Sequence, residues 1–330
     1  MCVVNKLSIY ISECFDVYKN LATEKYLFDN VDIDEIILYL WQNDNTVVIG
    51  RNQNAYAECN TGFVKEQNIN VARRLSGGGA VFHDLGNLNF TFICAKDNLN
   101  IKRNMQIIAD ACSKAGIETE ISGRNDILCD GRKFSGNAFY DMGEKAYHHG
   151  TIMINTDLGK MQKALTPSLE KLSSKGVKSV KSRVINLGEI SPFLTCKQMK
   201  DYLICSFENI YDKKAQRINE INEKNILQTA TEYSSHEYIF TKSPAFTFLV
   251  KGRFDWGSIE ILPEIKNELI TSLSVYTDAL VWGLSDIIKN ALTGCKFTYD
   301  DVAQKLSCVL EEKMTIDISE LLCKTNSPTN

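Results

Sequence analysis

The sequence lacks the features that mark several large classes of protein. Among its 330 residues no apolar run reaches the length of a membrane span, and a net charge of -4 provides no basic excess for general nucleic-acid binding. The N-terminal stretch is typical of neither a signal peptide nor an arginine-rich transit sequence. We therefore expect a cytoplasmic protein that binds neither membranes nor nucleic acid.

Paired cysteine motifs are also missing. The 11 cysteines form no Cys-x-x-Cys pair, and the 4 histidines have no cysteine or carboxylate at the spacing of zinc ligands. Disulfide frameworks of secreted proteins are compact and evenly paired, unlike this scattered set. We interpret the cysteines as reduced core residues, and we expect no metal site built from histidine and cysteine.

Apolar periodicity predicts alternating helices and strands. Helices are expected over residues 16–29, from Ile101 to Gly116 and from Thr195 to Tyr211, and a strand over residues 147–155. Residues 36–41 and 46–50 are expected to form a hairpin with a turn at 43–45, and the C-terminal part to contain strands over 246–250 and 256–262 followed by two short helices. We predict an α+β fold with mixed and antiparallel sheets and flanking helices in a large domain, residues 1–245, and a small α+β domain, residues 246–330.

Three adjacent glycines, Gly77–Gly79, follow two arginines. Glycines raise the entropic cost of folding and have no side chain to bury, so packing does not explain them. They let successive N–H groups converge on an anion, and Arg73 and Arg74 add planar donors that suit a phosphate or carboxylate. We expect a phosphate cradle, although a flexible hairpin turn remains open for the triplet alone. No Gly-Lys-Ser/Thr follows, which excludes a P-loop.

The residues on both sides of the glycines favour a mounted functional loop. Ala80–Phe82 has the composition of a strand, and Leu88, Phe90 and Phe92 alternate with polar residues as in a half-buried strand. Loops held between rigid strands commonly carry function.

A second candidate lies at Asp130-Gly131, a pair typical of a hairpin turn. The turn would place Asp126 and Lys133 on neighbouring strands and close in space. A lysine after a turn is most often a solvated charge, so spacing alone leaves the role of Lys133 open.

From Arg73 to Asp84 the chain resembles the lipoate–protein ligases, and further matching segments follow in the same order. The resemblance implies a biotin/lipoate ligase-like fold with a C-terminal accessory domain. It also implies the reaction: lipoate and ATP form lipoyl-AMP and pyrophosphate, with Mg²⁺, and the lipoyl group passes to a lysine of an acceptor. The implied acceptors are apo lipoyl domains of 2-oxoacid dehydrogenases and the glycine-cleavage H protein, and we expect a monomer.

Site residues are carried over from the family by matching motifs. The resemblance assigns the nucleotide to Arg74, Gly77, Gly78, Gly79, Ala80, Val81, Phe82, Asn125, Asp126, Lys133, Lys178 and Val180. It assigns lipoate to Ser76, His83, Lys133, Ser135 and His149, makes Lys133 the catalytic residue that bridges the carboxylate and the α-phosphate, and gives Asp126 to Mg²⁺. Residues 171–184 correspond to a loop that orders over the adenylate.

The chemistry of amide formation is consistent with these parts. A free carboxylate is a poor acyl donor, and an acyl-adenylate supplies AMP as a leaving group. The site must neutralise phosphates, hold the carboxylate near the α-phosphorus and keep water away. We expect the apolar residues Leu38, Leu40 and Val48 to line a tunnel for the acyl chain.

Three other functions stay open. An octanoyl or lipoyl transferase on the same scaffold would need an activated thiolate, for which Cys129 is the only cysteine inside a motif. A biotin ligase shares the same logic of attachment. A degenerate member that only binds lipoyl domains is the non-enzymatic alternative. Dependence on ATP separates the ligase from the transferase.

Lys133→Ala should abolish adenylate formation, because the variant lacks the ammonium that bridges the acid and the α-phosphate. The measurement is lipoate-dependent exchange of pyrophosphate into ATP. Exchange that persists in this variant would remove Lys133 from the mechanism.

Overall fold

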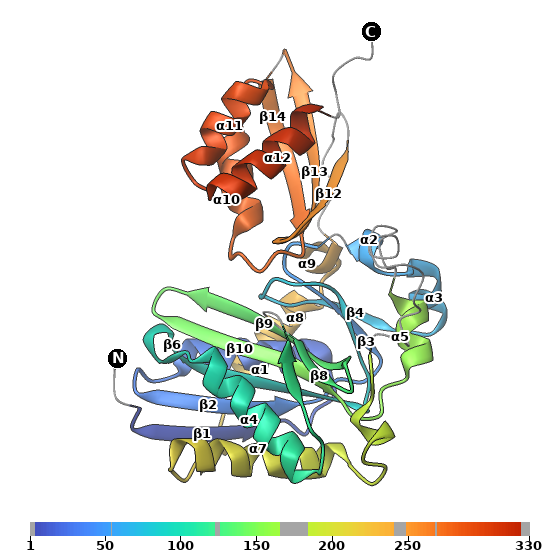
Figure 1. The fold of residues 1–330 in the computed structure, drawn as a ribbon, viewed down its shortest axis with the longest axis vertical. Helices are drawn as coiled ribbons and strands as arrows, with labels where there is room; N and C mark the ends of the chain where they lie inside the picture. Colours follow the sequence, from blue (N-terminus) through green and yellow to red (C-terminus); the bar gives the residue numbers. More distant parts are fainter. Residues whose placement is uncertain are drawn as a thin grey trace. The chain divides into compact units, whose positions relative to one another are not determined.

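The computed structural model describes residues 4–53, 55–122, 126–165, 184–240, 249–267 and 269–324. The chain forms two compact units (Figure 1). The first comprises Met1–Ile49, Ala55–Arg74 and Ala80–Ile239, and the second comprises Gly50–Asn54, Leu75–Gly79 and Phe240–Asn330. The predicted boundary at residues 245/246 falls within 241–248, outside the described residues, and remains a prediction.

An eight-stranded mixed sheet forms the centre of the first unit. Its order is β11-β1-β2-β6-β10-β9-β8-β7. β1 runs parallel to both β2 and β11, and the pairings from β2 to β7 are antiparallel. The strands are β1 (Lys6–Ile11), β2 (Glu35–Trp41), β6 (Asn87–Ala95), β7 (Glu120–Ser122), β8 (Asp126–Cys129), β9 (Arg132–Met142), β10 (Lys145–Met153) and β11 (Gln216–Arg217).

Helices cover both faces of this sheet (Figure 1). α4 (Ile101–Lys114) and α7 (Cys196–Tyr211) pack on one face and bury the main apolar core. α1 (Val17–Asn30) covers the other face and packs against α8 (Glu223–Tyr233). Shorter helices are α2 (Ala55–Glu58), α3 (Thr61–Glu66), α5 (Leu158–Ala164) and α9 (His236–Phe240).

The central strand β6 is buried on both faces. Every residue from Asn87 to Ala95 is buried. The strand is confirmed, but the prediction that it is half-buried is wrong, because the polar residues between Leu88, Phe90 and Phe92 face α1 rather than water. Buried polar side chains are usually hydrogen-bonded, and Thr91 finds its acceptor, Glu24, on α1.

The predicted hairpin of residues 36–41 and 46–50 is also wrong. Both edges of β2 are taken, by β1 and by β6. β3 (Thr46–Ile49) instead lies at the centre of a separate three-stranded sheet, between β4 (Asn70–Arg73) and β5 (Val81–His83). The glycine-containing stretch thus connects two strands that pair with the same neighbour, as expected for a mounted loop.

The second unit contains an antiparallel sheet of β12 (Val250–Phe254), β13 (Gly257–Lys266) and β14 (Leu269–Thr277). α10 (Leu284–Leu292), α11 (Tyr299–Ser307) and α12 (Glu312–Lys324) bury its core. Sequence periodicity anticipated β13 and the first two helices but missed β14 and α12. The strand expected over 246–250 lies at 250–254, and residues 246–248 are outside the described residues. The α+β class is confirmed in both units.

Several predicted helix ends are confirmed by their caps. The Asp16 side chain accepts from the Lys19 N–H at the start of α1, with 2.9 Å between the two atoms. Thr195 and Gln198 form a reciprocal capping box at the start of α7. Gly116, one residue past the C-cap of α4, has a φ of 74°, which glycine adopts without strain.

The prediction that the cysteines are core residues holds only in part. Cys205 and Cys308 are exposed, because they fall on the solvent side of α7 and just after α11, and every described cysteine is free. A search of the described helices finds none with the length and hydropathy to cross a membrane.

Thr195→Ala should destabilise the first unit by about 1 kcal/mol, the usual cost of losing an N-cap hydroxyl. The urea midpoint measures the change. Thr231→Ala, which removes an exposed hydroxyl bonded only to the Leu227 carbonyl, is the control and should change stability by less than about 0.5 kcal/mol. Equal midpoints for Thr195→Ala and the parent would contradict the assignment.

Candidate active site

Lys133 and Asp126 lie together, as the turn predicted. Asp130 and Gly131 have φ values of 50° and 68°, and the hairpin of β8 and β9 places the Lys133 Nζ 2.7 Å from the Asp126 Oδ1. Both side chains are more than one third exposed, so the ion pair contributes little to stability. The amine is therefore held at a defined position and is still open to exchange its partner.

A register shift in the β8–β9 hairpin determines the direction of the Lys133 side chain. Leu128 pairs with Lys133 but Ile127 pairs with Ser135, so one extra residue, Phe134, is accommodated in β9. Phe134 is fully buried in the core. Such bulges reorient neighbouring side chains and are frequent beside active sites. The Lys133 amine lies over Gly136, where an added Cβ would come within 3.0 Å of Nζ.

A buried polar cluster lies between α1 and the sheet. The Glu24 carboxylate, 2% exposed, accepts from the Thr91 hydroxyl at 2.7 Å and lies 2.8 Å from the His149 Nδ1. Thr91 in turn accepts from the Trp41 indole N–H at 3.1 Å. Three strands and one helix therefore converge on this carboxylate, and His149, predicted near the acyl ligand, is oriented by it.

The two arginines of the motif have different roles. Arg73 donates through Nε to the carbonyls of Tyr238 and Ile239, each at 3.2 Å, so it caps α9. Its Nη2 donates to the Ile239 carbonyl as well, so two of its three nitrogens are directed to α9, and its role as a phosphate donor remains a prediction. Arg74 is 6% exposed and donates to the Val48 carbonyl at 3.2 Å.

Arg74 is a buried positive charge that directly precedes the glycine loop in the sequence. Burial lowers the pKa of Arg74 to about 10, while Tyr147 and Glu24 act in the opposite direction. Arg74 thus remains protonated at neutral pH. A desolvated cation attracts an anionic ligand more strongly than one in water.

His83, at the end of β5, is a neutral buried imidazole. It is 3% exposed, its Nδ1 lies 3.0 Å from the Asn43 Nδ2, and its ring packs edge-on against Trp41 at 6.1 Å between centroids. Burial lowers the pKa of His83 to about 3, with the charges of Arg74 and His149 acting in the same direction. This histidine therefore offers hydrogen bonds rather than charge.

The glycine loop itself, residues 75–79, belongs to the second unit. Gly78 has a φ of 88°, and an added Cβ on Gly77 would come within 2.8 Å of the Ala279 carbonyl. The view that packing cannot explain these glycines is therefore wrong for Gly77, which needs the space. Gly79 differs: its φ is not positive, and an added Cβ would meet nothing within 4 Å.

Other predicted residues are placed as follows. Ser76, Phe82 and Ser135 are buried, whereas Ala80 and Val81 are half-buried. Asn125, Lys178 and Val180 lie outside the described residues. The same is true of residues 171–183, which make up nearly all of the segment expected to order over the adenylate. Leu38 and Leu40 pack in the main apolar core and Val48 is also buried, and their assignment to an acyl tunnel remains a prediction.

His148 points away from the polar cluster around Glu24. Its ring packs against Phe90, Phe92 and Phe139, and its Nε2 lies 2.9 Å from the Asn137 Oδ1. It is a hydrogen-bonded core histidine. Within the described ranges no three side chains of His, Cys, Asp or Glu gather as metal ligands.

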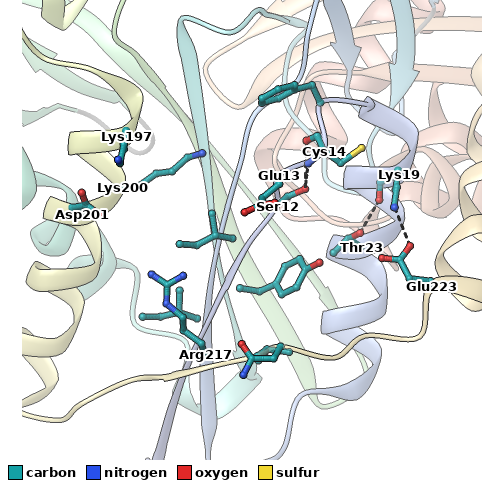
Figure 2. A pocket seen from close by; sticks show the side chains of 16 residues that line it. Ser12, Glu13, Cys14, Lys19, Thr23, Lys197, Lys200, Asp201, Arg217 and Glu223 are labelled. Atoms are coloured by element: carbon teal, nitrogen blue, oxygen red, sulfur yellow. Dashed lines mark hydrogen bonds and ion pairs between the residues drawn. The ribbon is translucent and has the colours of Figure 1, made fainter.

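A separate cleft of about 690 Å³ lies at the carboxyl end of β1 (Figure 2). Lys197 and Lys200 of α7 and Arg217 of β11 line one side, and the Ser12–Cys14 stretch and Lys19 line the other. Lys19 is paired with Glu223 at 2.9 Å. The lining carries both signs of charge, and it includes none of the predicted site residues.

Glu24, Thr91 and Asn43 were missed by sequence reasoning. A signal existed for Glu24: with Val17, Leu21 and Phe28 predicted on one face of a helix, Glu24 falls on the same face by spacing. A carboxylate on an apolar face is a candidate buried functional group.

Two family models match the chain. The model described as "Lipoyl protein ligase A/B catalytic domain" matches residues 16–208, and "Bacterial lipoate protein ligase C-terminus" matches residues 243–323. The chain is similar to the lipoate-protein ligase A of Bdellovibrio bacteriovorus, with 38% identity over 97% of this chain and 99% of that protein. The lipoate-protein ligase A of Psychrobacter cryohalolentis is 36% identical, with 91% of each covered.

Solved structures are similar over the same range. P. falciparum LipL1 in complex with lipoate has a TM-score of 0.84 and 29% identity, with 96% of this chain and 99% of that chain covered. A bipartite lipoate protein ligase from Thermoplasma acidophilum, solved with its E2 lipoyl domain, has a TM-score of 0.63 and 24% identity over 74% of this chain and 99% of that one. The second likeness concerns the fold alone.

Glu24→Leu should destabilise the protein by about 3 kcal/mol, because it leaves buried donors of Thr91 and His149 without their acceptor. Glu24→Gln, which keeps an acceptor oxygen, should cost less. Urea unfolding followed by tryptophan fluorescence measures both. Asp29→Asn, which breaks an exposed ion pair on the same helix, is the control. A Glu24→Leu midpoint equal to that of Asp29→Asn would contradict the role of Glu24.

Proposed function

This chain belongs to the lipoate–protein ligase A family, and from that premise we propose that it joins lipoate to a lysine of lipoyl domains at the expense of ATP. The observation that carries the proposal is the Lys133 amine, held 2.7 Å from Asp126 on a bulged strand. The resemblance of the glycine loop to this family, drawn from sequence, agrees with the catalytic-domain model, which matches residues 16–208.

In the first half-reaction a carboxylate oxygen of lipoate attacks the α-phosphorus of ATP. The bond from that phosphorus to the α,β-bridging oxygen breaks, and pyrophosphate leaves. Two anions must approach each other, so a positive charge between them lowers the barrier. We assign this charge to the Lys133 ammonium, which would exchange its contact with Asp126 for the carboxylate and the α-phosphate.

In the second half-reaction the neutral amine of the acceptor lysine attacks the acyl carbon of lipoyl-AMP. AMP leaves with the bonding electrons, the nitrogen loses a proton, and an amide remains. A carboxylate near the attacking amine can accept the proton, and Asp126 is suitable once Lys133 has turned to the adenylate. Exclusion of water keeps the mixed anhydride from hydrolysis.

Phosphate binding is assigned to the loop and to Arg74. Gly79 has free space where a Cβ would stand, which allows an anion to approach the main chain closely. The buried Arg74 cation lies at the start of this stretch in the sequence. The residues outside the described ranges, Asn125, Lys178 and Val180, stay assigned to the nucleotide by resemblance alone.

A magnesium ion fits the described residues only as a companion of ATP. Mg²⁺ typically binds through one or two carboxylates together with substrate phosphates and water. Asp126 is a partly exposed carboxylate next to the Lys133 amine and would hold the ion together with the phosphates. Bound there, Mg²⁺ would neutralise phosphate charge.

The acyl chain is assigned to the α1 face of the sheet. There His149 contacts Glu24 and the Trp41 ring packs edge-on against His83, and Ser76 and Ser135 remain assigned to lipoate by resemblance. This assignment differs from the tunnel of Leu38, Leu40 and Val48 that the sequence suggests. We propose apo lipoyl domains of 2-oxoacid dehydrogenases and the glycine-cleavage H protein as acceptors, and a monomeric enzyme.

The alternative transferase would need Cys129 or another thiolate. Cys129 is 4% exposed, and burial and then Asp130 raise the pKa of its thiol, which disfavours a nucleophilic role. This supports the ligase over the transferase.

One assay tests the function. The purified protein is incubated with ATP, Mg²⁺ and an apo lipoyl domain, with lipoate, octanoate or biotin offered in turn, and the acceptor mass is read. Lipoyl addition that requires ATP is expected. Modification without ATP from an acylated carrier would favour the transferase, biotin addition would favour a biotin ligase, and no modification with retained domain binding would favour the degenerate member.

Gly79→Ala should weaken ATP binding about tenfold, or about 1.4 kcal/mol, because the methyl group occupies the space left for phosphate. Stability should change by less than about 0.5 kcal/mol, since nothing lies within 4 Å of the added Cβ. Calorimetric titration with ATP and a urea midpoint measure the two effects. Gly62→Ala, an exposed helical position, is the matched control; unchanged ATP affinity in Gly79→Ala would contradict the cradle.

A further inference from the structure

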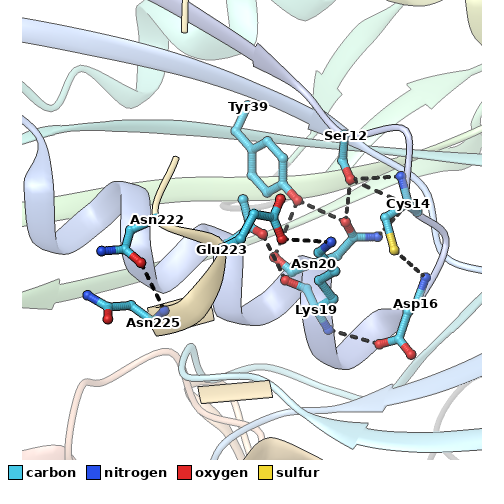
Figure 3. Close-up of polar contacts among 10 residues, drawn as sticks. Ser12, Cys14, Asp16, Lys19, Asn20, Tyr39, Asn222, Glu223 and Asn225 are labelled. Carbon is cyan, nitrogen blue, oxygen red and sulfur yellow. Dashed lines mark hydrogen bonds and ion pairs between the residues drawn. The ribbon is translucent and has the colours of Figure 1, made fainter. Parts of the chain in front are cut away.

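The orientation of a buried asparagine on α1 is determined by its neighbours. The Asn20 side-chain nitrogen lies 2.9 Å from the Cys14 carbonyl and 2.8 Å from the Gln42 carbonyl. Backbone carbonyls only accept, so this end of the amide must be the NH₂ group. The Asn20 oxygen then accepts from the hydroxyls of Ser12 at 2.7 Å and Tyr39 at 3.1 Å (Figure 3).

The orientation of Asn20 determines that of Asn43. The Asn20 NH₂ group lies 3.0 Å from one end of the Asn43 amide. That end must be the oxygen, because two NH₂ groups would otherwise face each other. The Asn43 NH₂ group is therefore the end that lies 3.0 Å from the His83 Nδ1.

The Asn43 donor in turn determines the state of His83. An NH₂ group can only donate, so the Nδ1 of His83 must be an acceptor and carries no proton. The ring is buried and neutral, so its single proton resides on Nε2. That Nε2 is itself buried, and no hydrogen-bond partner for it is found among the described residues.

We propose that Asn20 and Asn43 are positioning residues that hold His83 as the Nε2–H tautomer, so that it presents a buried donor to an acceptor atom of the acyl substrate. The inference rests on the proposed function for the identity of the ligand, an acyl chain that carries a sulfur acceptor, which octanoate lacks. A buried donor without a partner is unfavourable, and a ligand atom that accepts from it removes this penalty. The hydrogen-bond relay from Asn20 through Asn43 to His83 therefore favours a ligand that has an acceptor atom next to the His83 Nε2 over a purely aliphatic chain.

The outer end of the relay reaches solvent. Ser12 lines the 690 Å³ cleft at the end of β1 and also accepts from the Cys14 N–H at 3.2 Å (Figure 2). Tyr39 supplies a second hydroxyl to the same Asn20 oxygen, so Ser12 is not the sole donor that orients it. Ser12→Ala should therefore leave the His83 tautomer unchanged.

The first test is nitrogen NMR of the full-length protein labelled with ¹⁵N-histidine. Only 4 histidines contribute signals, and the shifts of the two ring nitrogens distinguish the tautomers. The parent protein should show His83 as Nε2–H from pH 6 to 8. An Nδ1–H signal from His83 would overturn the proposal, and this result needs no variant to fold and no ligase activity.

Asn43→Asp reverses the donor. A carboxylate only accepts, so Nδ1 of His83 should gain the proton and the Nε2–H signal should be lost. Asn137→Asp is the matched control, because the Asn137 oxygen already lies 2.9 Å from the His148 ring and the variant keeps an acceptor there. An unchanged His83 tautomer in Asn43→Asp, with the fold retained by circular dichroism, would overturn the relay.

Kinetics separate positioning from a merely structural role. Asn43→Asp should raise KM for lipoate about fivefold, with kcat within about twofold, and should change KM for octanoate less. Equal changes for both acids, or a fall in kcat alone, would contradict a donor to the substrate. If the parent protein shows no ligase activity, the proposed function fails while the tautomer result stands on its own.

Discussion

The buried carboxylate of Glu24 is the constraint on which the first unit depends. Burying a charge without hydrogen bonds costs several kcal/mol, so a carboxylate under α1 requires donors from the sheet. Thr91 of β6 and His149 of β10 supply them at 2.7 and 2.8 Å. These contacts position α1 against the central strands. They make the α1 side of the sheet polar, although the buried face of a sheet in a globular protein is ordinarily apolar.

The two faces of the sheet consequently have different roles. Successive residues of a strand point to opposite faces. In β10 this separates two adjacent histidines: His148 packs among Phe90, Phe92 and Phe139 in the core, whereas His149 contacts Glu24. In β2 the same alternation places Leu38 and Leu40 in the core and Tyr39 and Trp41 on the polar face. The main apolar core lies on one face and the proposed chemistry on the other.

What could be predicted from the sequence was local. The Asp130-Gly131 turn brought Asp126 and Lys133 together, and Thr195 and Gln198 marked the start of α7, because each depends on residues a few positions apart. Interactions over long separations could not be inferred. Residues 36–41 and 46–50 look like a hairpin until β2 is found between β1 and β6.

Motif reading had the same limit within the glycine stretch. Arg73 and Arg74 are equivalent in a motif, yet only the fold shows that Arg73 bonds the carbonyls of Tyr238 and Ile239. Family membership, by contrast, followed from the order of whole motifs, which does not require knowledge of the contacts. The polar cluster around Glu24 needed the tertiary structure, since its members come from residues 24 to 149.

The allocation of the glycine stretch has a consequence for the covalent architecture. Residues 50–54 and 75–79 group with the second unit, although the strands on either side of them belong to the first, so the chain passes back and forth before it finally continues into β12. Asn52 accepts from the Thr277 N–H, and Gly77 lies against Ala279. The two units therefore cannot be separated by cleaving the chain at a single position. A fragment that ended near residue 239 would keep residues 50–54 and 75–79 but would lose Thr277 and Ala279, which they contact. These two segments can therefore pack in their final place only after the last quarter of the polypeptide has been synthesised.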